Sequence, residues 1–338
     1  MADDSSRRAA AAAVFRRMDE VAAQCGGRFP LFRVPEMEEW TLSRRGSWMG
    51  GFWAGLWWLR AAAGGRAEDR ERARRWSRSL APALDEPSVN RSFVFWYGAT
   101  LGWLLLADDE AAALSRQAAA ALAADFDAGA GLWPLGAGMG AGPAGRGRLN
   151  VDALAPTLAL MQIHGELAGQ ALGRSHLAAC LARLAREDGA WCADVALEGG
   201  EEPAAGQWQR GQAWAILGLA RAVQAEPLAH AAAALRACAY WNDHWGAARW
   251  PADADDPCAR AIAAVGMYRL GRSLPEAGWL HDGAAAELDR VLSDEVIRSG
   301  RFPGHRYRIA ADEVRLVESP CATFFLLEAL LMWDGVGV

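Results

Sequence analysis

Lysine is absent from this chain, and all 35 of its basic side chains are arginine. The absence excludes a lysine nucleophile and a lysine Schiff base. Arginine without lysine, beside many alanines, is typical of a genome rich in G and C.

Motifs built on cysteine, histidine or serine are also missing. The six cysteines form no CxxC pair, and the six histidines do not stand at metal-ligand spacing, so we expect no metal and no cofactor. Most cysteines stand in alanine-rich helical surroundings, where free cysteine packs as a small apolar side chain. No GxSxG motif indicates a serine hydrolase. The Gly-rich stretch 135–148 lacks the lysine of a phosphate-binding loop and is predicted to be a flexible connector.

The charge balance argues against two classes of partner. The net charge is -6, which gives no electrostatic reason to expect nucleic acid or an anionic membrane. The first 20 residues lack the basic-then-apolar order of a signal peptide, and no apolar run is long enough to cross a membrane. We therefore expect a cytoplasmic protein whose partner is a small molecule or an oligosaccharide. The sequence leaves its oligomeric state open.

Six mostly apolar helices recur along the chain, each after a polar or small residue. Hydrophobic residues make up 52% of the sequence, enough for a large core. The six segments are 46–62, 90–107, 150–167, 207–223, 256–271 and 319–333.

Amphipathic helices are predicted between these segments, at 7–24, 67–83, 109–125, 171–187, 228–241 and 281–297. A helix that is apolar all round must be enclosed, whereas a helix with one polar face lies at a surface. Strand signals are sparse. The pattern predicts an all-α fold, an (α/α)6 barrel of six inner and six outer helices spanning residues 1–338 as one domain. An open α-solenoid is the alternative, although the very apolar last helix argues against it.

Charged residues where inner helices begin are the candidates for chemistry, because a charge deeper in such a helix would be buried. Asp152 opens the third helix, Arg210 opens the fourth, and Glu318 precedes the sixth. Asp253, Asp255 and Asp256 precede the fifth. Helix N-caps are the alternative role for these aspartates, above all for Asp256. A carboxyl in an apolar pocket would have a raised pKa, which suits general acid/base work.

Tryptophan is abundant, with 17 residues, and gathers near the same helix starts. Indole faces stack on the flat C–H faces of sugar rings, so some of these residues are candidates for substrate binding. Core packing is the alternative and suits Trp57 and Trp58 best, whereas Trp133 and Trp208 lie in connectors. The candidates are Trp48, Trp53, Trp133, Trp208 and Trp214.

Several stretches, in order along most of the chain, resemble the unsaturated glucuronyl hydrolases and the related unsaturated rhamnogalacturonyl hydrolases, glycoside hydrolase families 88 and 105. These are SWMGGFWAGLWWL, NVDALAPTLAL, WQRGQAWAILGLA, the segment 251–264 and FFLLEALL. The resemblance implies the (α/α)6 barrel and an enzyme that hydrates the C4=C5 double bond of a terminal unsaturated uronic acid, without metal or organic cofactor. The hemiketal that forms then collapses and releases the sugar.

The resemblance also implies roles for residues. Asp152 corresponds to the family's central acid/base, Arg210 and Trp214 to the Arg and Trp of its RGQAW motif, and Trp133 to a sugar-stacking tryptophan. Gln212 of the same motif and Asp253 join the predicted substrate-binding set.

The second inner helix departs from the family pattern. Val89 and Asn90 stand where the family has a His-Asp pair. We predict that Asn90 shares the catalytic site, where an amide holds water but cannot take a proton. This departure keeps two alternatives open: an enzyme of the same fold acting in biosynthesis on another enol ether or sugar-like molecule, and a non-catalytic sugar-binding protein.

Overall fold

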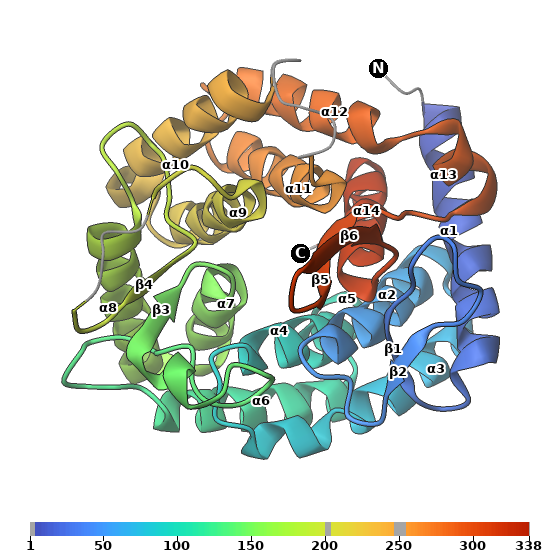
Figure 1. Ribbon diagram of the computed structural model, residues 1–338, viewed down its shortest axis with the longest axis horizontal. Coiled ribbons are helices and arrows are strands. Elements are labelled where there is room, and N and C mark those ends of the chain that lie inside the picture. The colour runs from blue at the N-terminus through green and yellow to red at the C-terminus, as the bar shows by residue number, and fades with distance from the viewer. Residues whose placement is uncertain (1–3, 200–203, 247–254, 338) are drawn as a thin grey trace.

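Six helical stretches form a closed inner ring in the computed structural model (Figure 1), which describes residues 4–199, 204–246 and 255–337. Neighbours pack in chain order, and the last helix packs against the first. This closure identifies the fold as the predicted (α/α)6 barrel and excludes the open solenoid. The inner stretches are α2 (Met49–Gly64), α4 (Arg91–Phe95) continuing through a π-helical turn (Trp96–Thr100) into α5 (Leu101–Leu106), α7 (Leu154–His164), α9 (Gln209–Ala225), α11 (Pro257–Ser273) and α14 (Pro320–Leu331).

The outer layer consists of helices that each pack on an inner neighbour. They are α1 (Asp4–Cys25), α3 (Ala67–Arg78), α6 (Asp109–Ala124), α8 (Glu166–Leu184), α10 (Pro227–Trp241) and α12 (Trp279–Val291). The predicted outer helix at 281–297 is interrupted, because the Ser293 side chain caps a separate short helix, α13 (Asp294–Ser299).

Burial separates the two layers as the apolar patterns predict. Every residue of α2 from Met49 to Ala61 is buried, whereas α3 buries only Asp69, Ala73 and Ser77, one stripe at helical spacing. Close packing of the inner ring depends on Gly51, since a Cβ there would lie 2.5 Å from the Cα of Val94.

Three small antiparallel sheets were not predicted. β1 (Phe29–Phe32) pairs with β2 (Thr41–Ser43), β3 (Arg148–Asn150) with β4 (Asp194–Ala196), and β5 (His305–Ala310) with β6 (Glu313–Val317). Strands this short give only a few alternating residues, which is too weak a pattern to recognise. Because β2, β3 and β6 directly precede α2, α7 and α14, the sheets lie at the end of the ring where inner helices begin (Figure 1).

Within the described ranges, none of the helices combines the length and the apolar character that a membrane crossing requires.

Candidate functional site

Asp152 lies in the turn that joins β3 to α7. The turn is fixed from both sides, because Asn150 pairs with Asp194 in the β3–β4 register and the Val151 amide donates to the Ala193 carbonyl at 3.0 Å. The N-cap position of α7 is Ala153, and no side chain caps this helix. The alternative role of Asp152 as a helix cap is therefore wrong.

The Asp152 carboxyl group has an unusual electrostatic environment. Its Oδ1 atom is buried and has no hydrogen-bond partner within the described part of the chain. Burial raises the pKa of Asp152 to about 7; nearby Arg210 opposes the increase and Asp194 adds to it. A carboxyl that titrates near neutrality can both donate and accept a proton, as general acid/base chemistry requires.

Two amide oxygens at the same end of the ring are also unpartnered within the described residues. The Oδ1 atoms of Asn90 and Asn150 are buried without a hydrogen-bond partner among the described residues. Asn90 stands at the start of α4, which packs against α7, and Thr157 of α7 donates to Ser92 of α4 at 3.0 Å. Buried polar groups are seldom left unsatisfied, so unpartnered oxygens at two adjoining helix starts indicate a place where water or a ligand binds.

Arg210 joins three elements at the same end of the ring. Its guanidinium donates to the carboxylate of Asp256 and, from both terminal nitrogens, to the carbonyl of Arg306 in β5 at 3.2 Å. It also lies over the Trp208 ring, 5.1 Å from the ring centroid. Asp256 is the N-cap of α11, as the alternative role for that residue predicted.

Two of the predicted tryptophans lie among aromatic rings near the helix starts. Trp48 is half-buried, with its ring centroid 6.0 Å from that of Phe93 and 6.1 Å from that of His305. Trp214 is buried between Phe93 and Phe325, at 5.2 Å from each. Trp48 and Trp208 keep exposed surface, whereas Trp214 does not.

Trp53 and Trp133, the other two predicted tryptophans, are buried by neighbouring residues of the protein. Trp53 is buried against Trp57 and Trp76, between α2 and α3. Trp133 is 1% exposed, and its indole N–H donates to the Leu122 carbonyl at 2.7 Å. An indole with almost no exposed surface cannot stack on a sugar ring. We therefore leave both residues out of the proposed site.

Gln212 is likewise a structural residue. It is fully buried, accepts from the Trp191 amide at 2.9 Å, and donates to the carbonyls of Gly189 and Ala237 at 2.8 and 3.1 Å. Because the side-chain oxygen and nitrogen of Gln212 are both hydrogen-bonded to the backbone, its predicted role in substrate binding is not supported. Asp253, the remaining predicted residue, lies outside the described residues.

Two polar residues of this end of the ring were not predicted. Asn150 had a weak signal, since it stands two residues before Asp152. The sequence carries no signal for His305, because none of the other candidate residues lies close to it along the chain. Its imidazole is fully buried, and burial, followed by the charge of Arg210, holds its pKa well below the ordinary value.

The chain resembles several solved structures over nearly its whole length. The unsaturated glucuronyl hydrolase of Bacillus sp. GL1, responsible for the degradation of glycosaminoglycan, has a TM-score of 0.81 at 22% identity, covering 98% of this chain and 97% of that one. A heparin-specific unsaturated glucuronyl hydrolase has a TM-score of 0.81 at 17% identity, with the same coverage. A mutant of the Streptococcus agalactiae enzyme, complexed with dGlcA-GalNAc6S, has a TM-score of 0.75 at 14% identity, covering 98% and 92%.

Neither a protein-family model nor a curated protein sequence matches the chain. At identities of 14–22% the structural likeness shows a shared fold. The resemblance drawn from the sequence motifs is confirmed at that level, as that of a diverged chain with the fold of the unsaturated glucuronyl hydrolases.

Proposed function

We propose that this protein is a hydrolase that acts on an unsaturated uronyl sugar by hydrating its C4=C5 double bond, with Asp152 as general acid/base. The observation that carries the proposal is the Asp152 carboxyl, whose Oδ1 atom is buried without a hydrogen-bond partner among the described residues and whose pKa burial raises to about 7. Such a group is protonated often enough at neutral pH to donate to carbon.

The reaction needs only water and one proton carrier. Protonated Asp152 donates its proton to C4, and water adds at C5. The resulting carboxylate takes a proton from that water, so the side chain returns to its starting state. The hemiketal at C5 then collapses and releases the neighbouring sugar, and the net change is the addition of one water molecule.

Other residues at this end of the ring bind and orient the substrate and the attacking water. Asn90 and Asn150 offer buried amide oxygens that accept hydrogen bonds from water or a sugar hydroxyl. Arg210 supplies fixed positive charge near Asp152 and suits the carboxylate of a uronic acid. Trp48 and Trp208 keep exposed indole surface, which suits stacking on a sugar ring. One structural neighbour was solved with dGlcA-GalNAc6S, a ligand of this chemical class.

Asn90 favours a second candidate function. An amide cannot carry the negative charge that an aspartate would supply, so one carboxyl would serve alone. The second candidate is therefore an enzyme of the same fold in small-molecule biosynthesis, which hydrates, dehydrates or cyclises another enol ether or sugar-like substrate through Asp152.

The first test follows the absorbance of the unsaturated uronate during incubation with lyase-generated disaccharides. We expect the absorbance to fall with wild-type protein, and kcat/KM to decline above about pH 7 because Asp152 must be protonated. Asp152→Asn should lower kcat by about 10²–10⁴-fold, the usual contribution of a general acid/base. Asp109→Asn, at an exposed position of α6, is the matched control and should retain activity.

No absorbance change at high wild-type concentration would contradict the first function. Asn90→Asp then separates the two candidates. Turnover gained by this variant would show that the family chemistry was lost with the second carboxylate. If the variant also stays inactive, the second candidate is favoured.

A further inference from the structure

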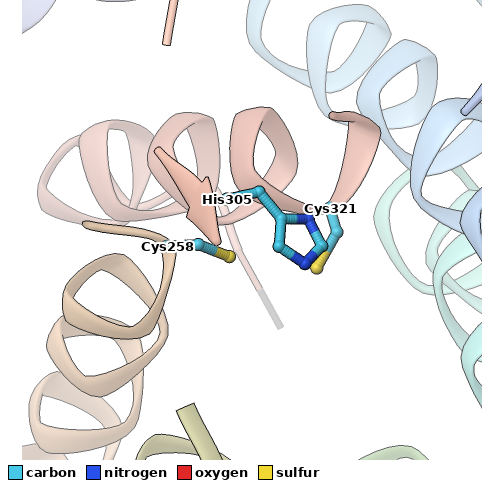
Figure 2. Close-up of side chains that lie close together, drawn as sticks. All are labelled: Cys258, His305 and Cys321. Carbon is cyan, nitrogen blue, oxygen red and sulfur yellow. The ribbon is translucent and has the colours of Figure 1, made fainter. Parts of the chain in front are cut away.

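Cys258, His305 and Cys321 form a compact cluster that the proposed hydration does not use. One potential ligand atom from each, two sulfurs and an imidazole nitrogen, all lie within 4.8 Å of one another, and the three residues are fully buried. Figure 2 shows the Cys258 sulfur directed toward the imidazole, with the Cys321 sulfur beside the ring.

A repeated sequence pattern places the two thiols. Asp256-Pro257-Cys258-Ala259 begins α11, and Ser319-Pro320-Cys321-Ala322 begins α14. In each pattern the first side chain is the N-cap and accepts from the alanine amide, at 3.3 Å in α11 and 3.1 Å in α14. Each cysteine is therefore the second residue of its helix, and α11 and α14 are neighbours in the ring.

The β5 strand brings the histidine to the same place. Gly304, just before β5, accepts a hydrogen bond from the Cys258 amide at 2.8 Å. The imidazole Nδ1 of His305 lies 2.7 Å from the hydroxyl oxygen of Ser319. Its Nε2 is buried and has no hydrogen-bond partner within the described ranges. When Nδ1 carries the proton, the Nε2 lone pair is free to bind a metal, and Ser319 orients the ring as outer partners of metal-bound histidines do.

We propose that Cys258, His305 and Cys321 bind one thiophilic divalent cation of the zinc class through two thiolates and the imidazole Nε2. Thiolate and imidazole are the ligands that zinc prefers, and three protein ligands leave a fourth position for water or another donor. With bonds of about 2.0–2.3 Å, tetrahedral ligand atoms lie roughly 3.5–3.8 Å apart. The ligand atoms of the cluster, which all lie within 4.8 Å of one another, therefore need to approach by at most about 1 Å.

Charge also suits a divalent cation. Two thiolates neutralise its charge, so the bound ion would place no net charge among the fully buried side chains. No sequence motif indicates this cluster, because the three ligands come from three separate segments. The proposal is independent of the proposed hydration, which requires no metal.

The experiment titrates the reduced, full-length protein with Zn²⁺ in competition with a chromophoric chelator. We expect one equivalent of Zn²⁺ to bind and to raise Tm, because a ligand that prefers the folded state stabilises it. Co²⁺ in place of Zn²⁺ should give a thiolate-to-cobalt charge-transfer band. Cys258→Ser, Cys321→Ser and His305→Gln should each weaken binding at least tenfold.

Cys238→Ser is the matched control, since Cys238 is equally buried in α10 and outside the cluster. Its binding should equal that of the wild type. The proposal is overturned if the reduced wild-type protein binds no Zn²⁺, or if Cys258→Ser and Cys321→Ser bind it as the wild type does. The wild-type titration and the Co²⁺ spectrum do not depend on any variant folding correctly.

Discussion

At the scale of single residues, Asp152 combines a position that suits chemistry with a cost in stability. Its buried carboxyl has a pKa of about 7 in the folded protein, whereas an aspartate in an unfolded chain titrates near 3.9. The folded state therefore binds the proton more tightly. The folded protein then loses stability as pH rises from about 4 to about 7, and the penalty stays constant above that range.

Asp152→Asn should remove this penalty. We expect the variant to unfold with a free energy about 1–4 kcal/mol higher than the wild type at pH 8. The two free energies should be similar at about pH 3, below the pKa of the carboxyl in both states. Urea unfolding at both pH values measures the difference. Equal stabilities at pH 8 would contradict a strongly raised pKa.

The sequence indicates some residues of this end of the ring more clearly than others. Asp152 and Arg210 are candidates from the sequence because charge at the start of an apolar helix is conspicuous. In the fold, the positive charge of Arg210 opposes the rise in the pKa of Asp152. The role of Trp133 was not predictable, because an indole in a connector can lie on a surface or under one. Tertiary contacts with Leu122, Phe126 and His176 enclose it.

At the scale of elements, Gln212 connects α9 to the loop before β4 and to the end of α10. Its three hydrogen bonds to the backbone of Gly189, Trp191 and Ala237 are buried. Gln212→Ala should lower the free energy of unfolding by about 2–4 kcal/mol, because it leaves buried backbone groups without partners. Urea unfolding measures the loss.

Gln224→Ala is the control for this change, because Gln224 is exposed on the same helix; its stability should stay within about 0.5 kcal/mol of the wild type. A substrate-binding role for Gln212 would instead raise KM and leave stability unchanged. That result would restore the role that the sequence analysis predicted.

At the scale of the whole molecule, Glu318 ties the two ends of the chain together where the ring closes. Its carboxylate, 2% exposed, accepts from Arg17 of α1 at 2.8 and 3.1 Å and from Arg33 at 2.5 Å. The backbone of Arg33 also pairs with that of Glu318. This buried carboxylate pairs with two guanidinium groups and so stabilises the closed ring. Removing its charge would leave both arginines without this ionic partner.

Glu318→Gln should therefore lower the free energy of unfolding by about 3–5 kcal/mol, measured by urea or thermal unfolding. Glu313→Gln, at an exposed position of β6, should change it by less than about 0.5 kcal/mol. Similar stabilities for the two variants would show that the ring closes without this ion pair.

The sequence by itself determined the two helical layers and their order, because helix periodicity and apolar content are local properties that each segment carries alone. It also indicated which helix starts bear charge. Only the tertiary structure decided which buried atoms lack partners, which tryptophans are enclosed, and that Cys258, His305 and Cys321 meet. Those properties depend on the ring closing, which brings segments far apart in the chain within bonding distance of one another.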